Sequence, residues 1–218
     1  MSLKINLKNQ GFSIVELLVT LVVVSIVVGA VYLVSKGQEK NMLVEDRVAE
    51  LQSSLQSGVM LLAKELRMAG YDPTCSRAPC SGFVSANATS LSFIQKDPIT
   101  NNQKLISYSL YDSGGDGDND LGRLVGSGTL QPVILNVDAF DLVYFSSTGT
   151  RLSTPVSNSD LAKIKVVEIT IVAHSETPDP NYKATPQFTN LQGETVFIAP
   201  ADGYRRKSVR LRVYCRNN

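Results

Sequence analysis

The sequence has very few of the residues on which most enzyme chemistry depends. It contains no tryptophan and a single histidine, His174, so a Ser-His-Asp triad or a histidine-rich metal site would rest on one ring. Neither sign of charge is in excess, because 21 Lys and Arg residues stand against 20 Asp and Glu residues. No GxGxxG, P-loop, nucleophile-elbow or HExxH motif occurs. We therefore expect a protein that is not an enzyme and needs no cofactor, with no global field to attract nucleic acid.

Apolar residues concentrate near the amino terminus. Residues 12–34 read FSIVELLVTLVVVSIVVGAVYLV with Glu16 as their one charge, and residues 17–35 carry none. A helix of this length spans the hydrocarbon core of a bilayer, roughly 30 Å, and this run is apolar on every side, unlike most core helices. We predict a transmembrane helix over residues 12–35. Lys4 and Lys8 place the amino terminus in the cytoplasm by the positive-inside rule, with the rest of the chain across the membrane.

The junction before this run carries a family resemblance. The segment GFSIVELL at residues 11–18, with a basic leader before it and an apolar helix after it, resembles the processing signal of type IV prepilins and pseudopilins. The resemblance implies that residues 1–11 are a leader peptide. It also implies that a prepilin peptidase cleaves between Gly11 and Phe12 and that Phe12 is then N-methylated.

Glu16 has a physical reason to take part in assembly. A carboxylate inside a bilayer costs a few kcal/mol, so such residues usually have a partner. The amine that cleavage creates on Phe12 lies near the same depth, and pairing with it within or between subunits would offset that cost and set the axial register. The alternative is that Glu16 only snorkels to the headgroups. We favour the assembly role.

Beyond the membrane, residues 36–71 are predicted to continue the helix with one apolar stripe. Its members follow 4-3-4-4-3-4 spacing, and they are Val44, Val48, Leu51, Leu55, Val59, Leu62 and Leu66. Gly70 is expected to end the helix, and Gly29, Gly37 and Gly58 are positions where it is expected to bend. The segment ELRMAGYD at residues 65–72 is similar to the corresponding part of PilW-type minor pilins. GspJ-type minor pseudopilins of type II secretion share the same general plan.

Residues 72–218 are predicted to form one β-rich head domain. Runs of β-branched and aromatic residues indicate strands at residues 91–94, 105–111, 133–135, 140–145, 164–172, 196–198 and 209–214. With the amphipathic half of the helix packed on an antiparallel sheet, the fold class is α+β and pilin-like. The resemblance places this head in the periplasm and then, as part of a filament, at the cell surface.

Three cysteines, Cys75, Cys80 and Cys215, lie on the side of the membrane where disulfides form. The residues alone leave all three pairings open. Cys75 and Cys80 enclose only four residues, so closing that loop costs the least entropy and we rank this disulfide first. Cys215 continues the inward positions of the last predicted strand and is expected to be a buried free thiol.

An acidic loop at residues 112–123 has two interpretations. Asp116, Asp118 and Asp120 alternate, and alternate carboxylates can converge on a hard cation such as Ca²⁺. The loop departs from an EF-hand, because Leu121 and Ser127 occupy the positions that need Gly and Glu. The other interpretation is a solvent-exposed turn in which Gly, Asp and Asn supply left-handed conformations. We favour the turn, and Ca²⁺ remains open because some pseudopilins bind calcium in a loop.

A basic cluster lies near the carboxyl end. Alternation predicts one strand face that carries Arg206, Arg210, Arg212 and Arg216, with Tyr214 among them. A cationic face with an aromatic residue suits the backbone of DNA, which some type IV pili take up. We favour instead the solvated side of an edge strand, or a surface that pairs with acids on neighbouring pilins.

The resemblance implies a minor pilin, a structural subunit that primes assembly of a type IV pilus or tips it. Its partners would then be other minor pilins, the major pilin, the prepilin peptidase and the inner membrane. Two alternatives remain open at this stage. One is a minor pseudopilin of a type II secretion system, and the other is an unprocessed, single-span adhesin or receptor.

Overall fold

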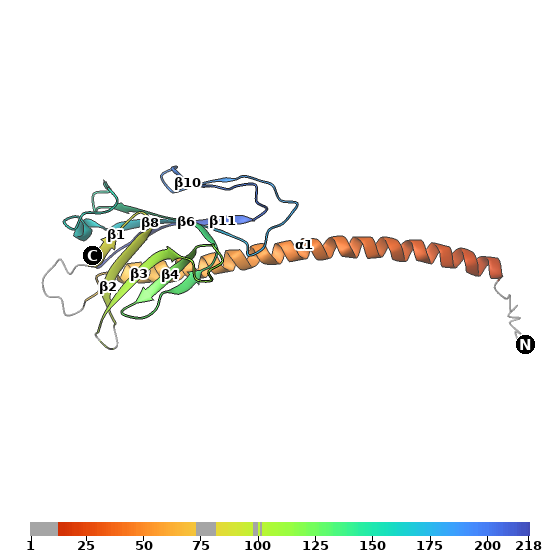
Figure 1. Cartoon of the computed structure of the whole chain (residues 1–218), viewed down its shortest axis with the longest axis horizontal. Helices are drawn as coiled ribbons and strands as arrows, with labels where there is room; N and C mark the ends of the chain where they lie inside the picture. Colours follow the sequence, from red (N-terminus) through yellow and green to blue (C-terminus); the bar gives the residue numbers. More distant parts are fainter. Residues whose placement is uncertain (1–12, 73–81, 98–99, 101) are drawn as a thin grey trace, which may run out of the picture. The chain divides into compact units, whose positions relative to one another are not determined.

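The computed structural model of the chain describes residues 13–72, 82–97, 100 and 102–218. Its one helix in this part of the chain, α1, spans Ile14–Met68, and a 3₁₀ turn, η1, spans Leu161–Lys163 (Figure 1). The first strands are β1 (Phe83–Ala86), β2 (Ser90–Lys96), β3 (Gln103–Tyr111), β4 (Asp120–Val125), β5 (Gln131–Ile134) and β6 (Val137–Phe145). The others are β7 (Arg151–Leu152), β8 (Val166–His174), β9 (Gln187–Thr189), β10 (Thr195–Ile198) and β11 (Arg206–Tyr214).

The chain divides into two compact units with the boundary between Asp46 and Arg47. In the first unit, the described residues form the amino-terminal part of α1, where the apolar side chains are exposed. The helix is long and apolar enough to cross a membrane by length and composition. The helix is unbroken through Gly29, Gly37 and Gly58, so it does not melt locally at any of these glycines.

In the second unit, the predicted stripe of α1 is the buried face of the helix. Leu55, Leu62 and Leu66 are fully buried, and Leu51 and Val59 nearly so. This 3.6-residue periodicity is what lets one helix face fill a core while the other stays in water.

Two glycines fit α1 to the rest of the head. A Cβ at Gly58 would overlap the side chain of Ile134, so the absence of a side chain lets the helix approach β5 closely. Gly70 ends the helical segment as predicted, with a positive φ of 76° that favours glycine, and its N–H donates to the carbonyl of Ile94 at 2.9 Å.

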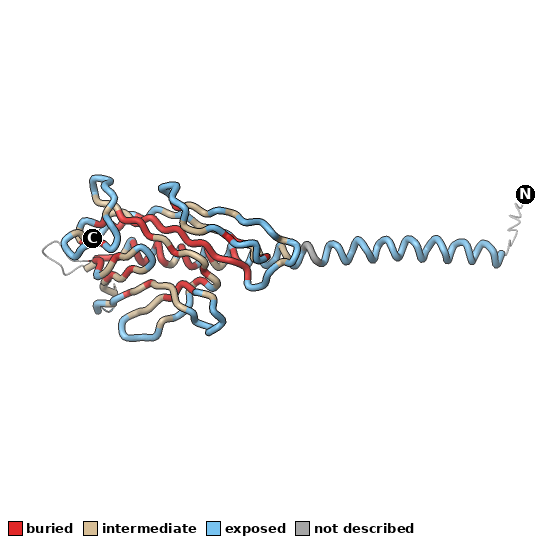
Figure 2. The backbone as a smooth tube through the Cα atoms, turned by 45° about the horizontal axis from the view of Figure 1, so that its top comes forward, coloured by how far each residue is buried: buried red, intermediate tan, exposed pale blue. Residues whose placement is uncertain are grey.

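The described residues of the head form three antiparallel sheets rather than the single sheet that the sequence suggests. One has the strand order β1-β2-β3-β4-β5, the second has the order β11-β8-β6-β7, and the third pairs β9 with β10. Buried side chains of α1 and of the two larger sheets form one hydrophobic core. The buried backbone, red in Figure 2, follows these central strands.

A second layer covers the outer face of the four-stranded sheet. Side chains alternate between the two faces of a strand, yet Glu168, Thr170 and Val172 of β8 are buried together with their inward-facing neighbours. Residues 176–204, here called the flap, contain β9 and β10 and supply this cover. The side chain of Gln192 in the flap, for example, donates from Nε2 to Oε2 of Glu168 at 2.7 Å.

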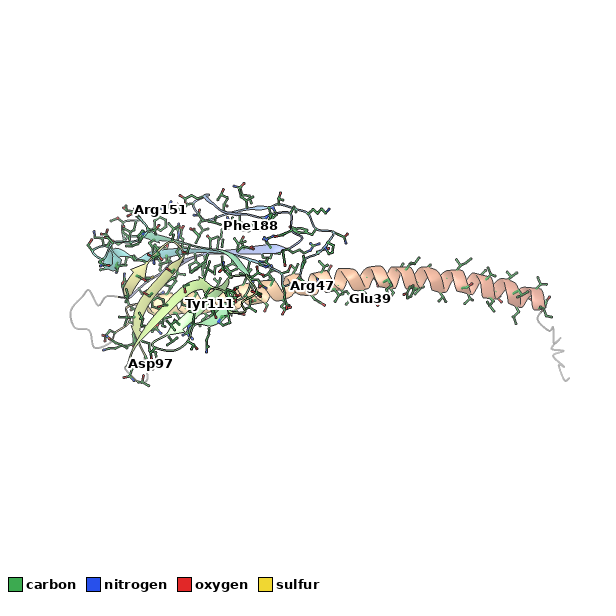
Figure 3. The ribbon with its side chains drawn as sticks, viewed as in Figure 1. Glu39, Arg47, Asp97, Tyr111, Arg151 and Phe188 are labelled. Carbon is green, nitrogen blue, oxygen red and sulfur yellow. The ribbon has the colours of Figure 1, made fainter. Side chains whose placement is uncertain are left out.

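The flap is fastened at its edge by an ion pair. Arg151 of β7 donates from Nη2 to Oε2 of Glu194 at 2.9 Å, and Arg151 is labelled in Figure 3. The hydrogen bonds from Arg151 lower the pKa of Glu194 to about 2. Both side chains are about half exposed, so this pair fixes geometry more than it adds stability.

The side chain of Asn218 links the carboxyl end of the chain to two other segments of the head. Its Oδ1 accepts the N–H of Gly82 at 3.0 Å, just before β1. Its Nδ2 donates to the carbonyls of Leu161 at 3.0 Å and Ile164 at 2.7 Å, at the two ends of η1. One side chain thereby satisfies backbone groups that no strand pairs.

Candidate functional site

The first part of α1 is the largest exposed apolar surface of the described chain. Its members include Ile14, Val15, Leu17, Leu18, Leu21, Val22, Val24, Ile26, Val27, Val31 and Leu33, each more than half exposed. Contiguous apolar surface of this extent marks a site for lipid or for other protein chains. Because the apolar surface surrounds the helix, it can contact lipid on all sides or several neighbouring helices at once.

Glu16 lies in the first turn of this helix and is exposed. Its backbone carbonyl accepts the hydroxyl of Thr20 at 2.9 Å, a local bond that does not involve the carboxylate. Gly11 and Phe12, the predicted cleavage and methylation residues, lie outside the described residues.

A buried ionic cluster joins α1 to the five-stranded sheet. Glu65 of α1 accepts the phenol hydroxyl of Tyr108 at 2.5 Å and the Nε of Arg123 at 3.0 Å. Burial, and then the hydrogen bond to Glu65, raises the pKa of Tyr108, and the same carboxylate raises the pKa of Arg123. The sequence alone did not predict this cluster. The pattern that indicates it is a charged residue, Glu65, directly beside Leu66 on the apolar face of the helix.

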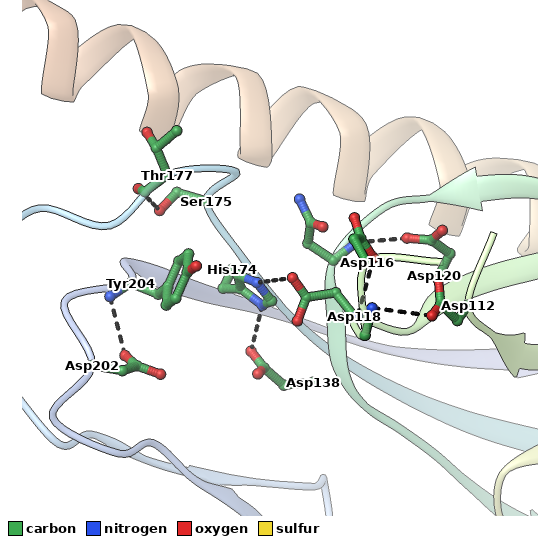
Figure 4. Close-up of polar contacts among 12 residues, drawn as sticks. Asp112, Asp116, Asp118, Asp120, Asp138, His174, Ser175, Thr177, Asp202 and Tyr204 are labelled. Atoms are coloured by element: carbon green, nitrogen blue, oxygen red, sulfur yellow. Dashed lines mark hydrogen bonds and ion pairs between the residues drawn. The ribbon is translucent and has the colours of Figure 1, made fainter. Parts of the chain in front are cut away.

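The acidic loop is built as a turn whose carboxylates bind its own backbone (Figure 4). Asp112 accepts the N–H groups of Gly115 at 2.5 Å and Gly117 at 3.0 Å, and these bonds, led by that of Gly117, lower its pKa. Asp116 accepts the N–H of Asp118 at 3.1 Å. Such bonds are typical of the turn interpretation.

The three candidate calcium ligands serve different partners. Asp120 is buried and accepts the N–H of Asn136 at 2.9 Å, whereas Asp118 lies 3.6 Å from Nε2 of His174. Asp116 is engaged with its own loop. Within the described ranges, no group of three or more His, Cys, Asp or Glu side chains is arranged to hold a metal ion. The structure therefore does not bring these carboxylates together as one ligand set.

His174 is buried at the end of β8, where its neighbours hold the ring in place and do not form a catalytic triad with it. Its Nδ1 lies 3.3 Å from Asp138, and its ring packs edge-on against Tyr204 with centroids 4.6 Å apart (Figure 4). The neighbouring Ser175 donates its hydroxyl to the carbonyl of Thr177 and not to His174. The ring also borders a cavity of about 490 Å³, whose other lining residues include Glu50, Asn136 and Glu176.

Alternation along β11 places Arg206, Arg210 and Arg212 on one face of the strand, but the three side chains have different environments. Arg206 is buried between Asp138, at 2.9 Å, and Asp202, at 2.7 Å, and the bonds to Asp202 contribute most to its raised pKa. Arg212 is paired with the buried Glu168. Arg210 is exposed on the same strand. Two of the predicted cations, the buried Arg206 and the half-exposed Arg212, are thus neutralised by acids of the head.

Cys215 is a buried free thiol, as predicted. It is 2% exposed, belongs to the hydrophobic core, and burial raises its pKa to about 12. Cys75 and Cys80, the predicted disulfide, lie outside the described residues.

Comparisons with known proteins agree with this geometry. Residues 6–32 match the family model of the prokaryotic N-terminal methylation motif. The structure is similar to that of a solved type IV-like pilin from Thermus thermophilus, with a TM-score of 0.54. The match covers 77% of this chain and 97% of that chain at 18% sequence identity. The fold is type IV pilin-like.

This pilin-like chain therefore combines a prepilin motif with the α+β architecture predicted from its sequence. The motif includes Gly11, Phe12 and Glu16. No curated protein matches the chain, and the likeness to PilW-type proteins rests on the sequence segment at residues 65–72 alone.

Proposed function

We propose that the chain is a minor pilin, a structural subunit that primes assembly of a type IV pilus or tips it after cleavage between Gly11 and Phe12. The observation that carries the proposal is the methylation motif at residues 6–32, which leads directly into a helix whose apolar side chains are exposed. The pilin-like fold, which matches a solved type IV-like pilin over 77% of the chain, supports it. Other minor pilins, the major pilin and the prepilin peptidase are the proposed partners.

Glu16 is proposed to act at the step where the subunit leaves the bilayer for the filament. Before assembly the protein sits in the inner membrane with its head in the periplasm. Among packed helices, a Phe12 ammonium without a carboxylate would be an uncompensated charge, which costs about 3–5 kcal/mol when a buried pair is broken. Glu16 of a neighbouring subunit removes this penalty and so selects one axial register.

The test replaces Glu16 and separates insertion from assembly. Glu16→Leu makes the helix more apolar, so the amount of protein in the membrane fraction is expected to stay the same or rise. Recovery with sheared pili or with co-purified minor pilins is expected to fall by at least about tenfold, because about 1.4 kcal/mol already corresponds to that factor. Thr20→Leu, one turn further along the same face, is the matched control and should assemble normally.

Each outcome of this test has a defined meaning. Normal recovery of Glu16→Leu would show that Glu16 only snorkels. The intact mass of the membrane-bound wild type must lack residues 1–11, since an unprocessed anchor keeps them. Recovery with secretion pseudopilins instead of sheared pili would assign the chain to type II secretion.

A further inference from the structure

One edge of the head differs from the others in length and regularity. β11 has nine residues and pairs with β8 at every position without a bulge. It ends the four-stranded sheet, and no other strand in the described part of the chain pairs with its second edge. The remaining edge strands, β1, β5, β7, β9 and β10, have two to four residues.

The short edges also carry features that prevent pairing with another chain. The pairing of β1 with β2 contains a bulge, and so does the pairing of β5 with β4, where β5 also contains Pro132. Short length, bulges, proline and charged side chains are the usual means by which proteins block sheet edges. β11 has none of the first three, and its exposed cations, Lys207 and Arg210, disfavour only partners of like charge.

The hydrogen bonds at both ends of β11 show which of its backbone groups are open. The carbonyl of Arg205 accepts the N–H of Ser175, and Cys215 donates to the carbonyl of Lys165, so both residues face the β8 side. Because backbone groups alternate along an antiparallel strand, the even-numbered residues between them face the open edge. Ser208, Arg210 and Arg212 therefore present N–H and C=O groups to an incoming strand.

The side chains along β11 define what that strand must carry. On the inner face, Val209 and Leu211 are only partly buried although they pack against the core, because the sheet ends beside them. On the outer face, Arg210 forms no ion pair within the described ranges, whereas Arg206 and Arg212 are paired with acids of the head. A matching strand would have apolar residues on one face and carboxylates on the other.

We propose that β11 is a docking edge that binds an extended, alternately apolar and acidic segment of a different protein, which adds a fifth strand to the sheet. The backbone of the partner supplies affinity and its carboxylates, placed beside Arg210, supply specificity. This docking edge goes beyond the pilus proposal and does not depend on it.

Charge argues against a second copy of this chain as the occupant. Two β11 strands paired around Arg210 would bring Arg210 of each copy close together on one face of the sheet, and like charges across strands are destabilising. The same cations that discourage self-association thus favour an acidic partner.

The test uses the full chain in detergent micelles and a defined probe. The probe is a fluorescent, end-capped peptide of about ten residues that alternates valine and glutamate, a length that matches the edge. Its binding is measured by fluorescence anisotropy. The wild type is expected to bind it at least about tenfold more tightly than a valine–lysine peptide, with the difference shrinking at high salt.

Two variants locate the binding at β11. Ser208→Pro removes an open N–H while leaving the β8 ladder intact, and should weaken binding of the valine–glutamate peptide at least about tenfold, whereas Ser208→Ala should not. Arg210→Glu should reverse the preference toward the valine–lysine peptide. Arg216→Glu, the same charge change beyond the end of β11, is its matched control.

Each result of this experiment either supports or overturns the docking edge. Weaker binding to Ser208→Pro and a reversed preference in Arg210→Glu support the docking edge. Equal binding of the two peptides to the wild type, or an unchanged preference in Arg210→Glu, overturns it. The second readout remains decisive if Ser208→Pro does not fold, because Arg210→Glu alters only an exposed side chain.

Discussion

The Glu65 cluster predicts a specific loss of stability in the head. Glu65→Gln keeps the shape of the side chain but removes the charge that Tyr108 and Arg123 bind. Bonds to a charged group are worth about 1.5–3 kcal/mol each against about 1 for neutral pairs, so two such bonds lose about 1–4 kcal/mol together. The bond from Arg123 contributes less of this loss than the bond from Tyr108, since the Arg123 side chain is 29% exposed and water can reach it.

This loss is measurable as a change in melting temperature. For a domain of this size, about 3 kcal/mol corresponds to a decrease in Tm of roughly 6–12 °C. Near-ultraviolet circular dichroism of the full chain in detergent micelles follows the packing of its tyrosines. Glu50→Gln, exposed on the same helix, is the control and should change stability by no more than about 0.5 kcal/mol. A Glu65→Gln protein that melts with the wild type would refute the reasoning.

Three further predictions follow from the thiols, the acidic loop and the flap. Alkylation of the native protein should leave Cys215 unmodified because burial raises its pKa to about 12. Peptide mapping without reductant should link Cys75 to Cys80, and a disulfide to Cys215 would contradict both expectations. Adding Ca²⁺ should not raise Tm, since the loop carboxylates already have separate partners, whereas a rise that Asp118→Ala abolishes would establish the calcium site. The pKa of Asp202 falls from 3.8 to about 2, chiefly through Arg206, so its stabilising contribution is present above about pH 4 and is lost as the pH falls toward 2. Urea midpoints across that range should drop less in Asp202→Asn.

The helix and most strands could be predicted because their signals are local. The stripe that includes Leu55, Leu62 and Leu66 has helical spacing, and the alternation at residues 105–111 has strand spacing, so neither depends on the rest of the chain. β4 was missed because it starts within the acidic loop at Asp120 and contains Gly122, both of which indicate a turn.

The division of the head into two large sheets and a flap could not be predicted from the sequence, for a different reason. Residues 176–204 contain only two short strands and many turn residues, so they read as a connection. Their role appears only in the burial of Glu168 and Thr170 on a strand face that would otherwise meet water. A single sequence records which residues are apolar, but not which distant segment covers a polar face.

The arginines of β11 show how far charge patterning alone carries a functional argument. Alternation placed four cations on one face, and an unscreened face of that kind suits a nucleic acid backbone. Two of the acids that neutralise Arg206 and Arg212, Asp138 and Glu168, come from positions 44 or more residues away, so no local pattern reveals these two pairs. Each pair neutralises one cation that could displace a counterion from DNA, which weakens the case for DNA. Arg210 is the arginine of β11 that is exposed and forms no ion pair within the described ranges. A single cation beside an open row of backbone groups fits a short acidic strand better than a polyanion, and this is why the docking edge, and not the basic cluster as a whole, is the surface to test.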